Sequence, residues 1–347
     1  MSTVSGKEAV STENATRAAF GPVAAPAAGP AGAATTDPAG TLAAGPGGVP
    51  GPVAEAGAVR AGTGAPPRPV GAVRAWLRLL GSEVGLTLRR PRNIAMLAVL
   101  AVIPVLFGIA LRVFGGPDEG EPGGGPAILQ QVTGNGLFLA FAALSVLVQL
   151  LLPVAVAVVS GDSIAGEAGT GTLRYLLAVP AGRTRLLAVK YANTVVFCLA
   201  AVTAVVLSAL LTGLALFPAG PITLLSGGTI PFAEGVLRIG VVVLYVTAGM
   251  AALAAVALAL STFTEVSIGA IAATVVVVIV AQVLGVVPQL AVIQPYLLTT
   301  WWSGFDGVLR DPVALGDMAD GLLVFGAYAV VFGSVAWARF TGKDITS

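Results

Sequence analysis

The chain has 347 residues, of which 56% are hydrophobic and only 10% are charged. Soluble domains carry roughly 25% charged residues, so this composition predicts that lipid surrounds most of the chain. The formal net charge of +1 gives no reason to expect a nucleic-acid partner. Histidine is absent, which excludes imidazole metal ligands and Ser-His-Asp triads, and the single Cys198 excludes an intrachain disulfide.

Residues 1 to about 70 are mostly Ala, Gly, Pro, Ser and Thr, as in GPVAAPAAGPAGAATTDPAG. Such a tract buries too little apolar surface to offset the entropy of ordering it, so we expect a disordered cytoplasmic tail. It lacks the continuous apolar core of a secretory signal peptide. A solvated tether is the simplest interpretation, with regulation or partner binding as the alternative.

Residues 71–92 predict an amphipathic interfacial helix. Apolar side chains recur there at the i, i+3, i+4, i+7 spacing of one helix face, and basic and polar side chains occupy another. Such a helix is suited to lie flat among lipid headgroups, and Pro91 is expected to end it. The apolar face comprises Val73, Trp76, Leu77, Leu80, Val84 and Leu88, and the polar face comprises Arg74, Arg78, Ser82 and Arg89.

Six apolar segments of membrane-spanning length follow, so the expected fold is an all-α polytopic membrane protein. Frequent Ala, Gly, Ser and Thr within them permit close helix contacts, and Pro104 and Pro153 are candidates for kinks. A cytoplasmic tail at 341–347 ends the chain. The expected spans are 94–113, 137–159, 191–217, 236–261, 266–287 and 321–339.

The basic residues set the expected orientation, because cytoplasmic loops carry an excess of Lys and Arg. With both termini cytoplasmic, eleven basic residues lie inside and three lie outside. The arginine-, alanine- and glycine-rich composition is typical of a GC-rich bacterial genome, so we expect a bacterial cell membrane. The inner residues are Arg74, Arg78, Arg89, Arg90, Arg92, Arg174, Arg183, Arg185, Lys190, Arg339 and Lys343; the outer ones are Arg112, Arg238 and Arg310.

The stretch GDSIAGEAGTGTLRYLLAVPAGRTRLLAVKY, from Gly161 to Tyr191, lies between two apolar segments yet carries four basic residues. A basic side chain costs roughly 2.5 to 3.5 kcal/mol at the centre of a membrane helix, so 161–190 is not expected to be a seventh span. We expect a cytoplasmic excursion with a short helix whose apolar stripe meets a partner. An ordinary basic loop is the alternative. The stripe comprises Ile164, Leu173, Leu176 and Leu177.

This stretch resembles the intracellular segment between the second and third spans of type-2 ABC transporter permeases. The residues that carry the resemblance are Gly166, Glu167, Gly171, Thr172, Leu173, Leu176, Leu177, Pro180, Arg183 and Lys190. In that family the segment lies on or beside a coupling helix that docks on a separate ATP-binding subunit. Residues 71–92 similarly resemble its elbow helix. Ala168 and Gly169 depart from the charged pair that the family often carries there.

The resemblance implies a permease subunit for ATP-driven export that contacts an ABC ATP-binding subunit and pairs with a second permease copy. The implied contact residues are Gly166, Glu167, Gly171, Thr172, Leu173, Arg174, Leu176 and Leu177. None of the three lysines stands in a phosphate-binding loop, so we expect no cofactor in this chain and ATP on the partner. The apolar spans weakly favour an amphipathic or drug-like substrate. A secondary carrier or channel, or a non-transporting scaffold, is the alternative.

Two further groups of side chains are candidates for the transport pathway. Gln149 and Gln282 lie within expected spans, where they either line a pathway or make interhelical hydrogen bonds. Tyr296, Trp301 and Trp302 belong to the outer segment 288–320. They predict either an outer gate or an aromatic anchor at the membrane interface.

Overall fold

The computed structural model describes residues 72–114, 135–169, 182–218, 220, 222–223 and 228–342. The chain divides into two units, Met1–Pro66 and Pro67–Ser347, and every described residue belongs to the second. The expected tail at 1–70 lies outside the described residues, as do residues 343–347.

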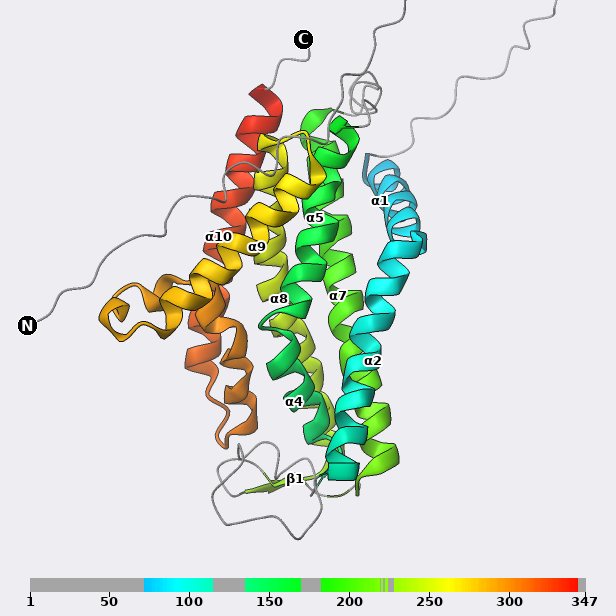
Figure 1. Cartoon of the computed structure of the whole chain (residues 1–347), viewed down its shortest axis with the longest axis vertical. Coiled ribbons are helices and arrows are strands. Elements are labelled where there is room, and N and C mark those ends of the chain that lie inside the picture. The colour runs from blue at the N-terminus through cyan, green and yellow to red at the C-terminus, as the bar shows by residue number, and fades with distance from the viewer. Residues whose placement is uncertain are drawn as a thin grey trace, which may run out of the picture. The chain divides into compact units, whose positions relative to one another are not determined.

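Among the described residues, six helices are long and apolar enough to cross a membrane, the same number as the spans expected from the sequence. Each overlaps one expected span, and the fold is mostly helical (Figure 1). They are α2 (Pro91–Phe114), α5 (Leu151–Gly169), α7 (Arg183–Leu216), α8 (Phe232–Phe263), α9 (Ser267–Val286) and α10 (Leu315–Gly342).

Successive long helices run in alternating directions, so the start of α2 and the end of α10 lie at the same end of the bundle (Figure 1). The helix α1 (Ala72–Arg89) also lies there, and we call this the α1 end. At the opposite end, β1 (Ile222–Thr223) pairs antiparallel with β2 (Thr229–Ile230), a small departure from the all-α expectation. We call that the hairpin end.

The second expected span, 137–159, is not one continuous helix. It consists of α4 (Phe138–Leu147), a turn at 148–150 and α5. Pro153 explains the break, because its ring has no N–H to donate to the carbonyl of Gln149 and would clash with it. Gln282 on α9 donates its side-chain Nε2 to that carbonyl, so a neighbouring helix satisfies the freed acceptor. By contrast, α2 is unbroken across Pro104.

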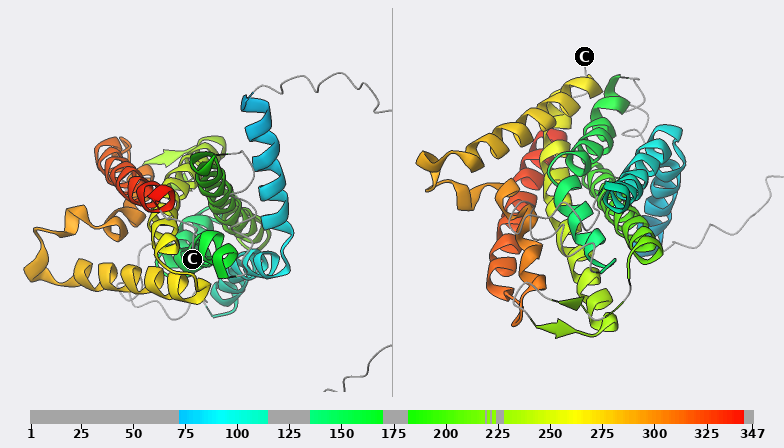
Figure 2. Two further views of the ribbon diagram at one scale, coloured as in Figure 1. Left: turned by 90° about the horizontal axis from the view of Figure 1, so that it is seen from above. Right: turned by 60° about the horizontal axis from the view of Figure 1, so that its bottom comes forward.

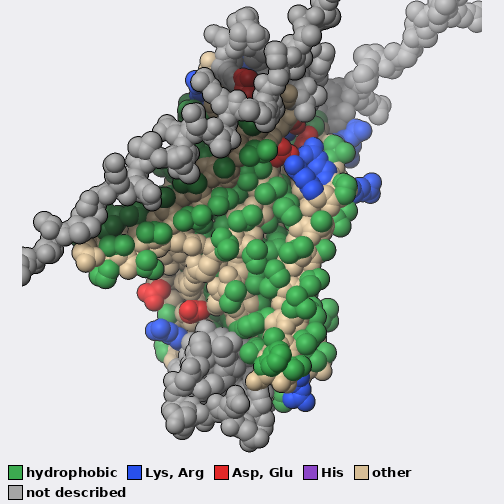
Figure 3. All heavy atoms as spheres, viewed as in Figure 1, with side chains coloured by type: hydrophobic (Ala, Val, Ile, Leu, Met, Phe, Trp, Pro, Cys, Tyr) green, Lys and Arg blue, Asp and Glu red, His purple; other side chains and the backbone are tan. Residues whose placement is uncertain are grey.

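The helix α8 forms the centre of the bundle. In its most apolar stretch 72% of residues are buried, against 17% in α2, α9 and α10. Large apolar side chains on the outer helices are consequently exposed, such as Leu106, Val280 and Val330. Figure 3 shows hydrophobic side chains covering the visible face between charged groups at its two ends. This is the surface expected of helices that face lipid.

The outermost part of the bundle is formed by α9 and three 3-10 helices. Seen from two further directions, α9 runs obliquely away from the other long helices (Figure 2). The chain turns at η1 (Pro288–Leu290) and η2 (Gln294–Tyr296) and returns through η3 (Leu298–Leu309), which packs against α8 and α10.

Candidate functional site at the α1 end

The corner between α1 and α2 is held by hydrogen bonds around Thr87. Asn93, in the first turn of α2, donates its Nδ2 to the Thr87 carbonyl over 2.8 Å. Asn193 on α7 donates its Nδ2 to the Thr87 Oγ1, also over 2.8 Å. Pro91 begins α2, where a missing backbone N–H costs nothing. The corner is therefore fixed both within itself and to the bundle.

A helix is present within the expected range 71–92 as α1, which ends at Arg89, and its interfacial position stays a prediction. The next helix, α2, begins at Pro91, three residues before the expected start of the first span. Seen along the bundle, α1 lies lengthwise along one side of it, beside α7, whereas α10 is strongly foreshortened (Figure 2). Its apolar face is only partly used by the bundle, because Trp76 and Leu80 are half-buried while Val73 and Leu77 are exposed. Those exposed side chains are available to lipid.

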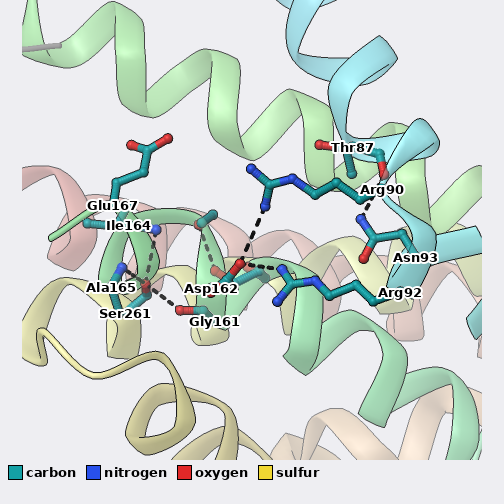
Figure 4. Close-up of polar contacts among 12 residues, drawn as sticks. Thr87, Arg90, Arg92, Asn93, Gly161, Asp162, Ile164, Ala165, Glu167 and Ser261 are labelled. Carbon is teal, nitrogen blue, oxygen red and sulfur yellow. Dashed lines mark hydrogen bonds and ion pairs between the residues drawn. The ribbon is translucent and has the colours of Figure 1, made fainter. Parts of the chain in front are cut away.

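Two arginines on either side of Pro91, one before α2 and one in its first turn, pair with one carboxylate on α5. Asp162 accepts from Arg92, and its Oδ2 lies 3.5 Å from the Arg90 Nη1 (Figure 4). Asp162 is largely buried, whereas both arginine side chains are about half exposed. The ion pairs connect residues about seventy positions apart in sequence, so they tie α2 to the end of α5.

A second ion pair joins the last turns of α5 to the first turns of α7. The Lys190 Nζ lies 2.5 Å from the Glu167 Oε1, and the two side chains are 4% and 22% exposed. Both residues belong to the motif that resembles the coupling segment. The structure therefore pairs them with each other across the chain segment 170–181 that connects α5 to α7.

Much of the expected excursion at 161–190 is helical and continues the flanking long helices. Residues 161–169 continue α5 and residues 183–190 begin α7, because both stretches keep helical hydrogen bonding beyond the apolar spans. Of the predicted contacts for an ATP-binding subunit, only Gly166 and Glu167 are described. The others, Gly171, Thr172, Leu173, Arg174, Leu176 and Leu177, lie outside the described residues.

A buried serine that no sequence pattern singled out fixes the end of α5 to α8. Ser261 Oγ accepts from the backbone N–H groups of Ile164 and Ala165 over 3.3 and 2.9 Å, and donates to the Gly161 carbonyl over 2.7 Å (Figure 4). The one feature of the sequence that could have drawn attention to Ser261 is its position at the end of an apolar segment. The start of α7 is bound to α10 in turn, since Arg183 donates to the Thr341 carbonyl over 2.8 Å.

A polar cavity of about 440 Å³ opens between these elements. Three basic side chains (Arg90, Arg92 and Lys190) and three acidic ones (Glu83, Asp162 and Glu167) line it, together with amide and hydroxyl groups. Figure 3 shows acidic and basic side chains adjoining at this end of the bundle. Over the described part of the chain, no cluster of three or more His, Cys, Asp or Glu side chains could hold a metal ion.

The glutamines proposed for a pathway lie together at the break between α4 and α5. Besides the bond from Gln282 to its carbonyl, Gln149 donates its Nε2 to the Ser303 Oγ over 3.0 Å. Both amides thus make the interhelical hydrogen bonds that were the alternative interpretation. Whether they also contact a substrate stays a prediction.

The three aromatic residues proposed for an outer gate occupy different environments. Trp302 is fully buried in the core, and Tyr296 is exposed. Trp301 donates its indole N–H to the Pro295 carbonyl over 2.8 Å, and its own carbonyl accepts from the Tyr245 hydroxyl over 2.9 Å. Trp302 therefore packs the core, while Trp301 connects η2, η3 and α8.

The model of a family described as "Protein of unknown function (DUF2705)" matches residues 127–346, more than half of the chain. The chain belongs to this family. No curated protein matches it. The DUF2705 match includes all helices from α4 to α10, whereas α1 and α2 precede it. The ion pairs of Asp162 therefore join the DUF2705 region to a helix outside the match.

Proposed function

We propose that this chain is the permease subunit of an ABC transporter. It forms a transmembrane pathway for ATP-driven export of an unidentified, amphipathic or drug-like substrate. The α1 end faces the cytoplasm, both termini are cytoplasmic, and α1 is the elbow helix at the inner surface of a bacterial membrane. A separate ATP-binding subunit docks on the segment between α5 and α7, and a second permease copy completes the pathway.

The observation that carries this proposal is the Glu167–Lys190 pair at the base of the segment 170–181. A force on that segment reaches α5 and α7 together, because a 2.5 Å ion pair joins the end of α5 to the first turns of α7. Both helices then run through the bundle, and α5 is hydrogen bonded to α8 through Ser261. Movement of the partner would therefore displace three helices as a unit.

The distribution of charge supports the orientation. Of the eleven basic residues assigned to the cytoplasm, Arg174 and Lys343 are outside the described residues. Of the other nine, Arg90 lies between α1 and α2, and eight lie on α1 or at the ends of α2, α7 and α10 that meet the α1 end. The three assigned outside, Arg112, Arg238 and Arg310, belong to the hairpin end. Such an asymmetry favours a cytoplasmic α1 end.

Co-purification tests the proposal. The full chain would be expressed with its neighbouring genes, solubilised in mild detergent and captured, and the eluate assayed for an ATP-binding subunit and for ATP hydrolysis. We expect Leu173→Asp to lose at least about tenfold of the recovered ATPase, because a buried charge opposes docking. The matched control is Leu315→Asp, which changes an exposed leucine at the hairpin end and should retain the ATPase.

The results separate the alternatives. An ATPase captured by the wild type and the control, and lost in Leu173→Asp that still reaches the membrane, supports a permease. Capture without stimulated ATP hydrolysis or transport favours the scaffold. Complete absence of an ATPase from every eluate would favour a carrier or channel that works alone.

A further inference from the structure

Three hydrogen-bond acceptors in the cavity at the α1 end have no donor among the described residues. The Oδ1 atoms of Asn93 and Asn193 are buried without a partner, and these residues are only 1% and 7% exposed. Their Nδ2 atoms are already committed to Thr87, which fixes which way each amide points. Glu83, one turn before Thr87 on α1, lines the same cavity and makes no ion pair with any described residue.

A buried acceptor without a donor is destabilising, so these oxygens call for a species that brings N–H or O–H groups. Two amide oxygens and one carboxylate together suit a primary ammonium group, which has three donors and a positive charge. A quaternary ammonium has no N–H and would leave both amide oxygens unsatisfied.

On the α2 side of the cavity, it is hydrogen-bond donors that need an acceptor. The Arg90 side chain is 55% exposed and reaches Asp162 through a single contact of 3.5 Å. A guanidinium has five N–H donors, so most of those on Arg90 remain available, and their planar arrangement matches phosphate oxygens. The six charged lining residues sum to zero, which favours a zwitterion over a net anion.

We propose that this cavity binds a phosphoethanolamine group, with its ammonium at Glu83, Asn93 and Asn193 and its phosphate at Arg90. The source is the headgroup of a bilayer phospholipid. The cavity lies beneath α1, at the end of the bundle where hydrophobic side chains give way to charged ones (Figure 3). A soluble phosphoethanolamine offers the same chemistry and is the other source to be tested. This proposal does not depend on an ATP-binding subunit.

Calorimetric titration of the purified full chain in detergent tests the site. The probes are dihexanoyl-phosphatidylethanolamine, the corresponding phosphatidylcholine and free O-phosphoethanolamine. We expect the ethanolamine lipid to bind at least about tenfold more tightly than the choline lipid, since charged hydrogen bonds are lost with choline. Glu83→Gln should weaken ethanolamine binding by at least about tenfold. Asp320→Asn, the same kind of change at an exposed site on α10, should leave it unaltered.

Each outcome decides the proposal. Equal affinity for the two lipids, or no binding of either, overturns it. If O-phosphoethanolamine binds as tightly as the lipid, the chemistry stands and the lipid source is wrong. Where Glu83→Gln does not accumulate, Asn193→Asp is the second variant. It keeps the acceptor oxygen and adds a charge, and the Thr87 hydroxyl, which accepts from Nδ2 in the wild type, can donate to the second carboxylate oxygen. It should tighten ethanolamine binding, and unchanged affinity would contradict the assigned position. All titrations use the chain without an ATP-binding subunit. A negative titration therefore contradicts this binding site alone, and a negative co-purification contradicts the permease alone.

Discussion

The two ends of the bundle are held together by different kinds of contact. At the α1 end, ionised side chains join separate helices, with Asp162 linking α5 to α2 and Glu167–Lys190 linking α5 to α7. At the hairpin end, α4 and α7 meet through backbone. Gly136 and Gly213 pack so closely that a Cβ on either would overlap the backbone of the other, and the Gly136 N–H donates to the Pro218 carbonyl over 3.1 Å.

The difference indicates which end can rearrange. The half-exposed arginines that pair with Asp162 can separate from it and find water or another charge, so α2 can move relative to α5, whereas a glycine–glycine contact has one close-packed geometry. Even the charged groups of the hairpin end follow this pattern. Arg238 pairs with Glu234 in its own helix and donates to the carbonyls of Val308 and Arg310, which fastens η3 by its backbone. We therefore expect movement at the α1 end around a fixed hairpin end.

The largest loss of stability should come from adding a methyl group at the contact between Gly136 and Gly213. Gly213→Ala places a methyl group against the Gly136 backbone, which cannot swing aside. We expect a loss of on the order of 3 kcal/mol of unfolding free energy, seen as a lower thermal midpoint in detergent. Gly240→Ala is the control, since nothing lies near its Cβ and alanine favours a helix by up to about 1 kcal/mol. Equal thermal midpoints for Gly213→Ala and Gly240→Ala would show that the glycine contact does not fix the hairpin end.

A smaller loss is expected when the inter-helix ion pair is broken. Glu167→Gln leaves the buried Lys190 ammonium without its carboxylate. Since Glu167 is 22% exposed, we expect about 2 kcal/mol, less than the 3 to 5 kcal/mol of fully buried pairs. The double variant Glu167→Gln/Lys190→Met should recover most of this loss in denaturant unfolding. Glu234→Gln, which breaks the pair within α8, should cost no more than about 0.5 kcal/mol. A larger loss there than at Glu167 would reverse the comparison.

The sequence predicted those elements that apolar periodicity and length are enough to identify, namely the six long apolar helices and the preceding α1. It did not predict the break at 148–150, although Pro153 was identified as a possible kink. Proline acts on the carbonyl four residues earlier, and the break persists because Gln282, distant in sequence, satisfies that carbonyl. The glutamines were chosen for their polarity, but their hydrogen-bond role depends on packing that a linear pattern does not contain.

The site was only partly visible in the sequence for the same reason. Glu167 and Lys190 stood out in a motif, yet their pairing depends on α5 and α7 extending past the apolar spans. Asp162, Asn93 and Asn193 are single polar residues, and none has a periodicity that marks it. What joins them is the corner at Pro91, with α1 and α7 lying side by side. That corner is fixed by the contacts of Thr87, and the one with Asn193 joins residues more than one hundred positions apart in sequence.

The smallest loss of stability is expected for Arg92→Gln, and its dependence on salt distinguishes the α1 end from the hairpin end. Arg92→Gln removes one of two half-exposed arginines from Asp162, and Arg90 remains, so we expect a loss of roughly 0.5 kcal/mol at low ionic strength. In 1 M salt, where the screening length falls to about 3 Å, wild type and variant should unfold at the same denaturant concentration. The loss in Gly213→Ala should be unchanged, because steric overlap is not screened. An Arg92→Gln loss that persists in 1 M salt would mean that Arg92 acts through packing. The α1 end would then be as rigidly built as the hairpin end, and the expected movement would have to be sought elsewhere in the bundle.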